Sequence, residues 1–550
     1  MGNKTKKVVK NSTKLFFSGV VVLTVANLLV KIIGLLFKIP MQSQLDDLGM
    51  GYYNNAYVLY TFFFTVSTTG LPIAVSIMIS EARSKGQHLQ IKKIFRTTVM
   101  LFVIIGLIGM IIMLCGAKFY SEYVLDAAPT YICIMAIAPT LFFICISSAY
   151  RGYFQGFQQM APTAVSELLE ALSKLVLGIL FALYALEQGY DINVVAAYAI
   201  AGLTIGAGLG MIFLCITKIF FNENAYLEEF TAKVGISDAV DKTSSILKRL
   251  IVIALPITIS ASVMSLTSLI DSSIVQKLLQ ISGTDQELAT AIYGNYTTLC
   301  IPMFNLPPVL IYPISAAIVP LIAAARNQGN EARTRTIMES ALRVAVLVGI
   351  PCGFGMSVLS KPILNLFFSG KPDSVNMAAP LLRLLAPSTI FICILAITNA
   401  ILQASGQERK PLISIIAGAI VKIISNSLLI LTIGMESTPI STFLCYLTVT
   451  CFNFFFVAKY AKVVPNVKRV FLRPFICGIL CAATALGSYT LLDYYGLNLK
   501  IATLCAILVA AVVYALLIFI LKAVTTEDVR LLPKGDKICR MLQKVHLIKD

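Results

Sequence analysis

Two lysines lie deep inside long apolar stretches of this chain, and their surroundings resemble each other. Each follows a proline, by twelve residues at Lys174 and by eleven at Lys422. Each of these prolines in turn follows a Gln-Gly or Gln-Ala pair, which begins at Gln155 and at Gln403. A charge at the centre of a bilayer costs about 2.5–3.5 kcal/mol, so it is rarely kept without a use. The pattern therefore predicts a duplicated cationic site inside a polar cavity of a transporter.

Two carboxylates accompany the first of these lysines. Glu167, Glu170 and Lys174 are separated by three, four and seven residues, which places all three on one face of a helix. One interpretation is an internal ion-pair stripe that neutralises Lys174. The other is a site for a substrate anion together with a coupling cation, Na⁺ or H⁺. The spacing is compatible with both.

Four further charged residues fall in apolar stretches. Lys31 and Lys38 are seven residues apart and share a helical face, although Lys38 could equally extend to the interface. Asp271 follows several Ser and Thr residues, either on a polar face or at an interfacial helix end, and Arg383 belongs either to a lumen or to the interface. The candidate substrate-binding cations are thus Lys31, Lys38, Lys174, Lys422 and Arg383, and the candidate coupling or ion-pair carboxylates are Glu167, Glu170 and Asp271.

Composition indicates a polytopic helical membrane protein. Of the 550 residues, 58% are hydrophobic and 13% are charged, and the mean hydropathy is +0.85. Soluble proteins carry about 25% charged residues. The sequence has only two histidines and no phosphate-binding glycine loop of the Walker type. We therefore expect no metal, no cofactor and no enzymatic activity, but a secondary transporter driven by an ion gradient or the membrane potential.

Crossing a membrane takes about 20 apolar residues of helix. The sequence contains fourteen stretches of this kind, so we predict an all-α fold with fourteen transmembrane helices. Their approximate ranges are 15–39, 53–80, 95–116, 130–150, 163–186, 193–219, 250–276, 292–322, 340–360, 378–402, 412–433, 438–458, 472–492 and 500–521.

The basic residues predict the orientation of these helices. Most of the 44 Lys and Arg residues fall in the segments on one side, which the positive-inside rule makes cytoplasmic together with both termini. The net charge of +17 therefore reflects membrane topology and not a nucleic-acid partner, and contacts with anionic lipid headgroups are a secondary effect of it. The few lysines on the outer side are Lys118, Lys277, Lys361, Lys371 and Lys500.

The duplication around the lysines extends over six helices. Ala82-Arg83 corresponds to Ala325-Arg326 at an offset of 243 residues, against 248 residues between Lys174 and Lys422. A repeat with an even number of helices is parallel, with both copies oriented alike. The predicted organisation is a basic cytoplasmic N-terminus at 1–14, six-helix lobes at 15–221 and 249–460, a cytoplasmic inter-lobe loop at 222–248, two further helices within 472–521, and a basic cytoplasmic tail at 522–550.

Prolines and glycines predict local features of two helices. The stretch 292–322 contains five prolines, so we expect it to be strongly bent or partly unwound. Gly202, Gly206 and Gly210 recur every four residues in the stretch 193–219, which is typical of close helix packing.

Three motifs resemble a known family. They are Gly-Met-Gly-Tyr-Tyr from Gly49 with Gly-Leu-Pro-Ile-Ala from Gly70, Tyr-Arg-Gly-Tyr-Phe-Gln-Gly from Tyr150, and Tyr-Gly from Tyr293 with the prolines up to Pro320. On these motifs the chain is identified as a member of the multidrug/oligosaccharidyl-lipid/polysaccharide (MOP) exporter superfamily. The branch is that of the stage V sporulation protein B and the Gram-positive MurJ-type lipid II flippases.

The resemblance implies both architecture and activity. It implies two six-helix lobes around a V-shaped cavity in a bacterial cell membrane. It also implies flipping of an undecaprenyl-pyrophosphate-linked sugar precursor, lipid II or a related intermediate, from the inner to the outer leaflet by alternating access. Basic residues of the first helix would serve the pyrophosphate, and Lys31 and Lys38 occupy that helix. The partners are then the lipid-linked oligosaccharide and membrane lipids, with the protein acting as a monomer.

Within this resemblance, the motif loop comprises Arg151, Gly152, Gln155 and Gly156. The chain departs from Gram-negative MurJ proteins in one respect, because its eighth helix has no basic residue before Arg326. This departure leaves the substrate open. An exporter of another lipid-linked polysaccharide repeat, for capsule or teichoic acid, is one alternative, and a cation-coupled multidrug antiporter is another. The net basic charge inside the membrane argues against the antiporter, and the short outer loops argue against a membrane enzyme.

Overall fold

The computed structural model describes residues 2–223, 240–461, 466–521 and 523–524, and these residues are helical with short connections and no strand. The predicted all-α class is therefore confirmed. Contacts divide the chain into unit 1, Met1–Lys277 with Gln286–Gly294, and unit 2, Leu278–Asp285 with Asn295–Asp550. Most of the expected inter-lobe loop at 222–248 and nearly all of the tail at 522–550 lie outside the described residues.

The described residues contain ten helices long and apolar enough to cross a membrane, or up to twelve if each of two bent pairs forms one span. Two of them, Val25–Ser84 and Lys410–Ala461, contain 60 and 52 residues. At about 1.5 Å per residue, each is long enough for two crossings of a ~30 Å core. The number fourteen and the cytoplasmic position of both termini remain predictions.

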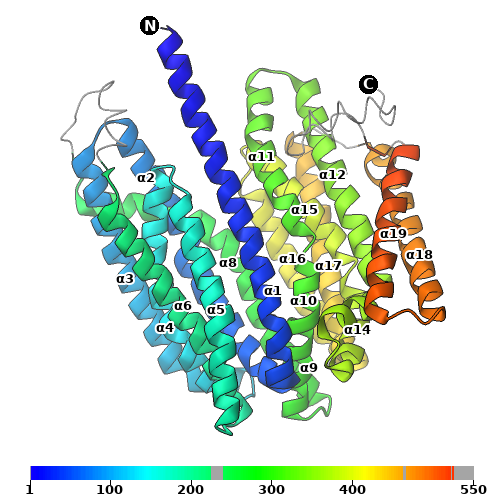
Figure 1. Cartoon of the computed structure of the whole chain (residues 1–550). Coiled ribbons are helices and arrows are strands. Elements are labelled where there is room, and N and C mark those ends of the chain that lie inside the picture. Colours follow the sequence, from blue (N-terminus) through cyan, green and yellow to red (C-terminus); the bar gives the residue numbers. More distant parts are fainter. Residues whose placement is uncertain (1, 224–239, 462–465, 522, 525–550) are drawn as a thin grey trace. The chain divides into compact units, whose positions relative to one another are not determined.

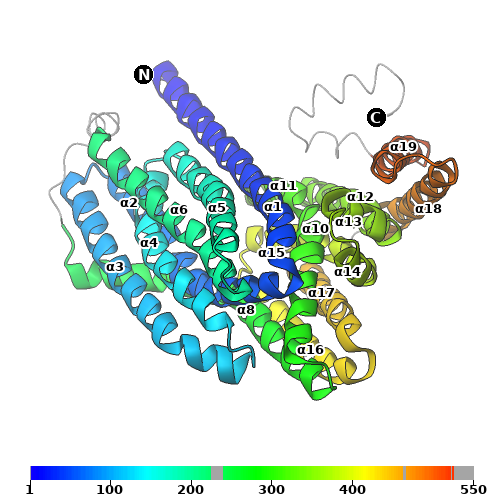
Figure 2. The ribbon, with the colours of Figure 1, turned by 60° about the horizontal axis from the view of Figure 1, so that its bottom comes forward.

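Unit 1 is a bundle in which α3, α4, α5 and α6 lie side by side (Figures 1 and 2). A π-helical turn, Tyr120–Val124, extends α3. The helices of this unit are α1 (Gly2–Thr68), α2 (Gly70–Ser84), α3 (His88–Phe119), α4 (Thr130–Gly156), α5 (Ala161–Glu187), α6 (Ile192–Phe220), most of α8 (Thr243–Ile281) and nearly all of α9 (Gln286–Asn295).

The predicted gap between the first two membrane helices, at residues 40–52, belongs to α1 and contains a kink at which two helices meet. Pro40 lies inside the helix, and the only non-helical backbone in it is at Asp46, with φ 54° and ψ −173°. Met41, Leu45 and Met50 of this segment are fully buried. Packing of these apolar side chains keeps the segment helical on either side of the kink, where its polar residues predict a loop. The second predicted helix is instead interrupted at residue 69, before Pro72, which is tolerated in the first turn of α2.

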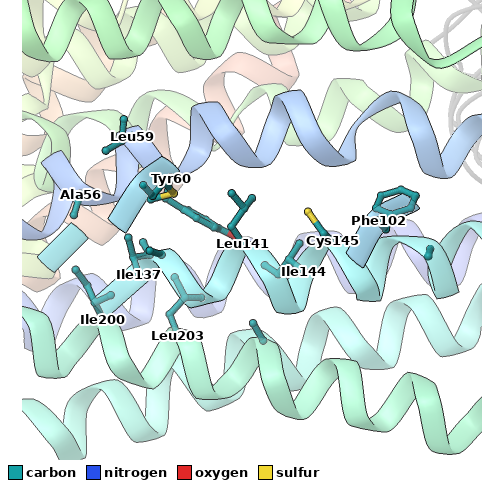
Figure 3. Packing of buried hydrophobic residues seen from close by; sticks show 14 of the residues in the cluster. Ala56, Leu59, Tyr60, Phe102, Ile137, Leu141, Ile144, Cys145, Ile200 and Leu203 are labelled. Atoms are coloured by element: carbon teal, nitrogen blue, oxygen red, sulfur yellow. The ribbon is translucent and has the colours of Figure 1, made fainter. Parts of the chain in front are cut away.

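The core of unit 1 forms around α4. The most apolar 18-residue stretch of α4 is 61% buried, the largest share among the ten helices that could cross a membrane. Figure 3 shows buried side chains of α1, α3 and α6 converging on it. The labelled residues are Ala56, Leu59 and Tyr60 from α1, Phe102 from α3, Ile137, Leu141, Ile144 and Cys145 from α4, and Ile200 and Leu203 from α6.

Unit 2 begins with a broken helix and ends with the α18–α19 hairpin, whose helices lie side by side in Figures 1 and 2. A hydrogen bond of 2.7 Å from the Tyr514 hydroxyl to the Leu347 carbonyl fastens α19 to α12. The helices are α10 (Ile301–Asn305), α11 (Pro308–Asn327), α12 (Glu331–Val358), α13 (Ser360–Phe368), α14 (Pro372–Leu385), α15 (Ser388–Ala404), α16 (Lys410–Ile433), α17 (Ser437–Phe456), α18 (Arg473–Tyr494) and α19 (Leu499–Ile520), with π-helical turns Tyr296–Cys300, Val457–Ala461 and Lys468–Leu472 and a 3₁₀ turn Gly434–Glu436.

The proline-rich stretch is broken as predicted. Around it, Gln286–Asn305 and Pro308–Ala323 are bent by 45° at residues 306 and 307, and the π-helical turn at 296–300 interrupts the first part. A second break, of 47° between α14 and α15, lies before Ser388 and divides the predicted helix 378–402. Pro387 has no backbone N–H to donate, which favours a break there.

Candidate substrate and coupling site

The motif at the end of α4 is helical, which corrects the expectation of a loop. Arg151, Gly152 and Gly156 are buried in its last turns. A Cβ on Gly152 would lie 2.7 Å from the Pro72 carbonyl oxygen, and one on Gly156 would lie 2.8 Å from the Ile79 side chain. The two glycines are therefore needed where α4 contacts α2, because any larger residue would separate the helices. Gln155 lies between them and is half-buried.

Arg151 forms the principal ion pair of unit 1. Its Nη2 donates to Glu170 Oε1 at 2.5 Å, and its Nε donates to Ser166 Oγ at 3.1 Å. The two charged side chains are only 11% and 13% exposed. The pair joins α4 to α5 on either side of the tight turn at 157–160. Charge-assisted hydrogen bonds of this kind are about twice as strong as neutral ones.

The glycine face of α6 makes room for this pair. A Cβ on Gly202 would lie 2.3 Å from the Gly178 backbone nitrogen, so α5 and α6 are in close contact, as the spacing predicts. A Cβ on Gly210 would lie 2.7 Å from Glu170 Oε1. The glycine at 210 therefore provides the space that the carboxylate occupies.

Glu167 adds a second carboxylate beside the guanidinium. Its charge interacts with Arg151 and with Glu170. Its Oε2 is buried and has no hydrogen-bond partner in the described part of the chain. The cluster thus contains two carboxyl groups and one guanidinium, so one more positive charge, a proton or a metal cation, would balance it.

Lys174 lies among aromatic rings of α1 and is not paired with these carboxylates. Its Nζ lies 4.8 Å from the ring centroids of both Phe37 and Tyr57, and 5.7 Å from that of Tyr53. Within the described residues it forms no ion pair with Glu167 or Glu170. The interpretation of an ion-pair stripe is therefore wrong for the lysine, because Glu170 turns to Arg151 instead. The three rings and Lys174 are called the lysine box below.

Two further predicted cations lie on α1. Lys38 is half-buried, and its charge is close enough to Lys174 for the two to repel each other. Lys31, two helical turns earlier, is exposed. The structure thus brings Lys38 and Lys174 together across α1 and α5.

The remaining predicted residues lie apart from the lysine box along the chain. Lys422 is half-buried near the middle of α16, as Lys174 is in α5. Arg383 is exposed in the last turn of α14. Asp271 is half-buried, and α8 continues for ten residues beyond it, so it does not end its helix. The substrate and coupling roles of all these residues remain predictions.

A second charged cluster, which the sequence did not indicate, closes the end of α6. Glu223 forms an ion pair with Lys218 and accepts a hydrogen bond of 2.6 Å from the Tyr153 hydroxyl. Burial alone would raise the pKa of Glu223, but these hydrogen bonds and the charges of Lys218 and Lys92 lower it overall. The Lys218 Nζ also lies 4.4 Å from the Tyr153 ring centroid.

Sequence signals for these contacts were weak but present. Phe37, Tyr53 and Tyr57 lie 117 to 137 residues before Lys174, and only the i, i+4 spacing of the two tyrosines marks a common helical face. Arg151 and Glu170 lie on either side of one short turn, which is the best sequence indication of their pairing. In the described ranges, no three His, Cys, Asp or Glu side chains gather in a way that could hold a metal ion.

Comparison with protein families gives two matches. The model described as "Polysaccharide biosynthesis protein" matches residues 16–325, which is more than half of the chain. The model described as "MatE" matches residues 256–428.

Two curated relatives come from Bacillus subtilis (strain 168), each 23% identical to this chain. The Stage V sporulation protein B aligns over 94% of this chain and 98% of its own length. The Lipid II flippase MurJ aligns over 86% of this chain and 88% of its own length. Each therefore resembles the chain almost from end to end.

Solved structures show the same fold. A Lipid II flippase MurJ in an inward closed conformation has a TM-score of 0.64 at 15% identity, and covers 91% of this chain and 98% of its own. An inward-facing multidrug resistance MATE family transporter of the MOP superfamily has a TM-score of 0.59 at 16% identity, and covers 79% and 99%.

Proposed function

Because the chain belongs to the polysaccharide biosynthesis protein family, on the branch of the MOP superfamily that includes stage V sporulation protein B and MurJ, we propose that it is a flippase for a lipid-linked sugar precursor. The protein is a multi-pass protein of the bacterial plasma membrane. Its substrate is an undecaprenyl-pyrophosphate-linked sugar, lipid II or a related cell-wall intermediate. It moves this substrate from the inner to the outer leaflet by alternating access, without enzymatic chemistry.

The lysine box carries the proposal. A lysine inside a membrane helix costs about 2.5–3.5 kcal/mol. A ring face offsets this by about 0.5–2 kcal/mol, so three rings offset much of the cost of a charge on Lys174 without a carboxylate. Lys38 adds a second positive charge nearby. Two like charges of this kind attract an anion, because it relieves their mutual repulsion. The pyrophosphate of the lipid carrier is such an anion.

The test is flipping of a labelled lipid-linked sugar in proteoliposomes. Lys174→Gln should abolish flipping, whereas Lys174→Arg keeps the charge and the ring contacts and should retain part of it. Lys500→Gln is the matched control, because Lys500 is an exposed lysine at the start of α19, and it should flip normally. Lys422→Gln tests the duplicated position in the same assay. Normal flipping by a folded Lys174→Gln protein would rule out the lysine box as the anion site.

Transport is driven, in this proposal, by the membrane potential or by a Na⁺ or H⁺ gradient. The cluster of Arg151, Glu167 and Glu170 is the candidate coupling site, because its charges are balanced only when one more cation is present. Glu167→Gln should make flipping insensitive to the coupling gradient. If flipping by the Glu167→Gln protein still depended on each imposed gradient, the coupling ion would have to bind at another site.

One observation favours a second candidate function. The MatE match over residues 256–428 and the likeness to a MATE transporter are compatible with a cation-coupled multidrug antiporter. The positive charges of Lys38 and Lys174 would repel a cationic drug. Export of a cationic dye from loaded vesicles would favour the antiporter. Rescue of a strain depleted of its lipid II flippase would favour the flippase, and rescue of a capsule or teichoic-acid exporter mutant alone would indicate a different lipid-linked polymer.

A further inference from the structure

The end of α17 and the start of α16 bring two lysines to one aromatic ring. Lys410 Nζ lies 4.9 Å from the ring centroid of Tyr460, and Lys459 Nζ lies 5.6 Å from it. Lys410 also lies 5.6 Å from the centroid of Phe456, and Lys459 lies 5.8 Å from that of Phe455. All of these residues belong to unit 2. The two lysines with Tyr460 are called the lysine pair below.

The chain does not neutralise this lysine pair within its described part. Neither Lys410 nor Lys459 forms an ion pair there, although other charged residues of the structure do. Lys459 is exposed and Lys410 is half-buried, so a ligand from outside the chain can reach both. Two ammonium groups at one ring repel each other, and an anion placed between them would remove that repulsion.

The corresponding place in unit 1 shows which ligand such a site accepts. α6 and α17 are the sixth helices of the two predicted repeats, and Lys218 and Lys459 near their ends are 241 residues apart, close to the offset of the repeat. Lys218 also contacts a tyrosine ring, but there Glu223 supplies a carboxylate from the chain itself. The lysine and ring in unit 1 therefore bind an anionic oxygen.

Unit 2 differs from unit 1 by an additional cation. Pro162 and Pro411 correspond in the repeat, and the residue before them is Ala161 in unit 1 and Lys410 in unit 2. Lys459 and Tyr460 lie in a π-helical turn, a rare form that often marks functional sites.

We propose that Lys410 and Lys459 bind the phosphate of an anionic lipid headgroup beside Tyr460. Lysine ammonium groups are common ligands of phosphate, and basic pockets at the cytoplasmic ends of membrane helices bind lipid headgroups. The site lies at the helix ends that the charge distribution predicts to be cytoplasmic. It does not depend on which substrate the protein transports, because no residue of the lysine box takes part.

Tryptophan fluorescence gives a direct test, because the chain has no tryptophan. Tyr460→Trp introduces a single fluorophore and keeps a ring for both lysines. The full-length variant is placed in nanodiscs containing either brominated phosphatidylglycerol or brominated phosphatidylcholine. Brominated phosphatidylglycerol should quench the fluorescence more strongly. Phe95→Trp is the matched reporter in unit 1, where Lys218 lies 5.4 Å from the ring and is already paired, and it should show no preference.

Variants of the lysines decide whether they make the site. In the Tyr460→Trp background, Lys410→Gln and Lys459→Gln should each weaken phosphatidylglycerol binding about fivefold, the effect of about 1 kcal/mol per lysine near a membrane surface. Lys459→Arg should keep most of the affinity. Both lysines lie at helix ends near the surface, so the variants are expected to fold. Equal quenching by both lipids, or a phosphatidylglycerol preference that survives both Gln substitutions, would overturn the proposal.

A competition arm identifies the source of the phosphate. Undecaprenyl pyrophosphate is added to nanodiscs that contain brominated phosphatidylglycerol. If it relieves quenching in the Tyr460→Trp protein and not in the lysine variants, the carrier lipid binds at this phosphate site. If it has no effect while the lysine dependence holds, the ligand is the membrane phospholipid. Relief of quenching that is equal with and without the lysines would contradict the site.

Discussion

A lysine contacts a tyrosine ring at the end of α6 in unit 1 and at the end of α17 in unit 2, but the two lysines differ in their ion pairing. At α6, Lys218 contacts the ring of Tyr153 and pairs with Glu223. At α17, Lys459 contacts the ring of Tyr460, and in the described part of the chain no carboxylate pairs with it. Unit 1 also pairs its buried Arg151 with Glu170.

The difference separates structural cations from binding cations. A cation that the chain neutralises with its own carboxylate contributes to stability, and removing the carboxylate leaves an uncompensated charge. A cation held only by aromatic rings costs little to remove and remains available to an external anion. By this criterion Arg151 and Lys218 are structural, whereas Lys174, Lys410 and Lys459 are binding residues. Removing the carboxylate partner of a structural cation should therefore lower the stability of the fold. Removing a binding cation should weaken anion binding and change the stability little.

The largest effect is expected when Glu170 is neutralised. Glu170→Gln leaves the buried guanidinium of Arg151 opposite a neutral amide, and should lower the free energy of unfolding by about 3 kcal/mol. Denaturant or thermal unfolding of the purified protein in detergent measures this loss. The matched control is Glu122→Gln in the exposed pair with Lys118, where the side chains are 35% and 76% exposed. Its loss should stay below about 1 kcal/mol.

A double variant tests the reason for this loss. Replacing Arg151 by Met together with Glu170 by Leu removes both charges, so most of the stability should return. If the Glu170→Gln protein were as stable as the unaltered chain, Arg151 would not be a structural cation. The distinction between structural and binding cations would then fail.

The class of fold could be predicted from the sequence, but not these partnerships. Apolar stretches of about 20 residues predict membrane helices because the bilayer requires every backbone group to be bonded internally. The glycines at 202 and 210 predict close packing for a similar local reason. Lys174 and Glu170 share a helical face, yet they turn to different neighbours, α1 and α4. Helical spacing specifies the face of one helix and not the helix that covers it.

Two helical segments were not predicted as helix. Residues 40–52 have the polar composition of a loop, but burial of Met41 and Met50 keeps them helical on either side of the kink at Asp46. The motif that begins at Tyr150 was expected to form a loop on the family resemblance, but it lies in α4, and its glycines contact α2. Here tertiary packing overrides local preference, which no single sequence reveals.

A smaller effect, which depends on pH, is expected at Glu223. Glu223→Gln preserves an acceptor for Tyr153 but removes the charge opposite Lys218, and should lower the stability by about 1 kcal/mol at neutral pH. The pKa of Glu223 is lower in the folded protein than in the unfolded chain, where glutamate titrates near ~4.3. The charge therefore stabilises the fold above that pH, and its contribution disappears as the pH falls through the lowered pKa.

The measurement for Glu223 is the difference in unfolding free energy between the native and Gln proteins across pH. The difference should be constant at neutral pH and shrink toward zero below about pH 4. A difference that persists unchanged in acid would mean that shape, and not charge, holds the end of α6. Lys218 would then not be a structural cation.

The smallest effect on stability is expected at Lys459, the counterpart of Lys218. Lys459→Gln removes a charge that the described chain does not pair, so the unfolding free energy in neutral detergent should change by less than about 0.5 kcal/mol. Adding phosphatidylglycerol should stabilise the native protein more than the variant, because a ligand stabilises only the state that binds it. If Lys459→Gln lowered the unfolding free energy in neutral detergent as much as Glu223→Gln does, Lys459 would be a structural cation. If phosphatidylglycerol stabilised the native protein and the variant equally, Lys459 would have no role in binding the lipid.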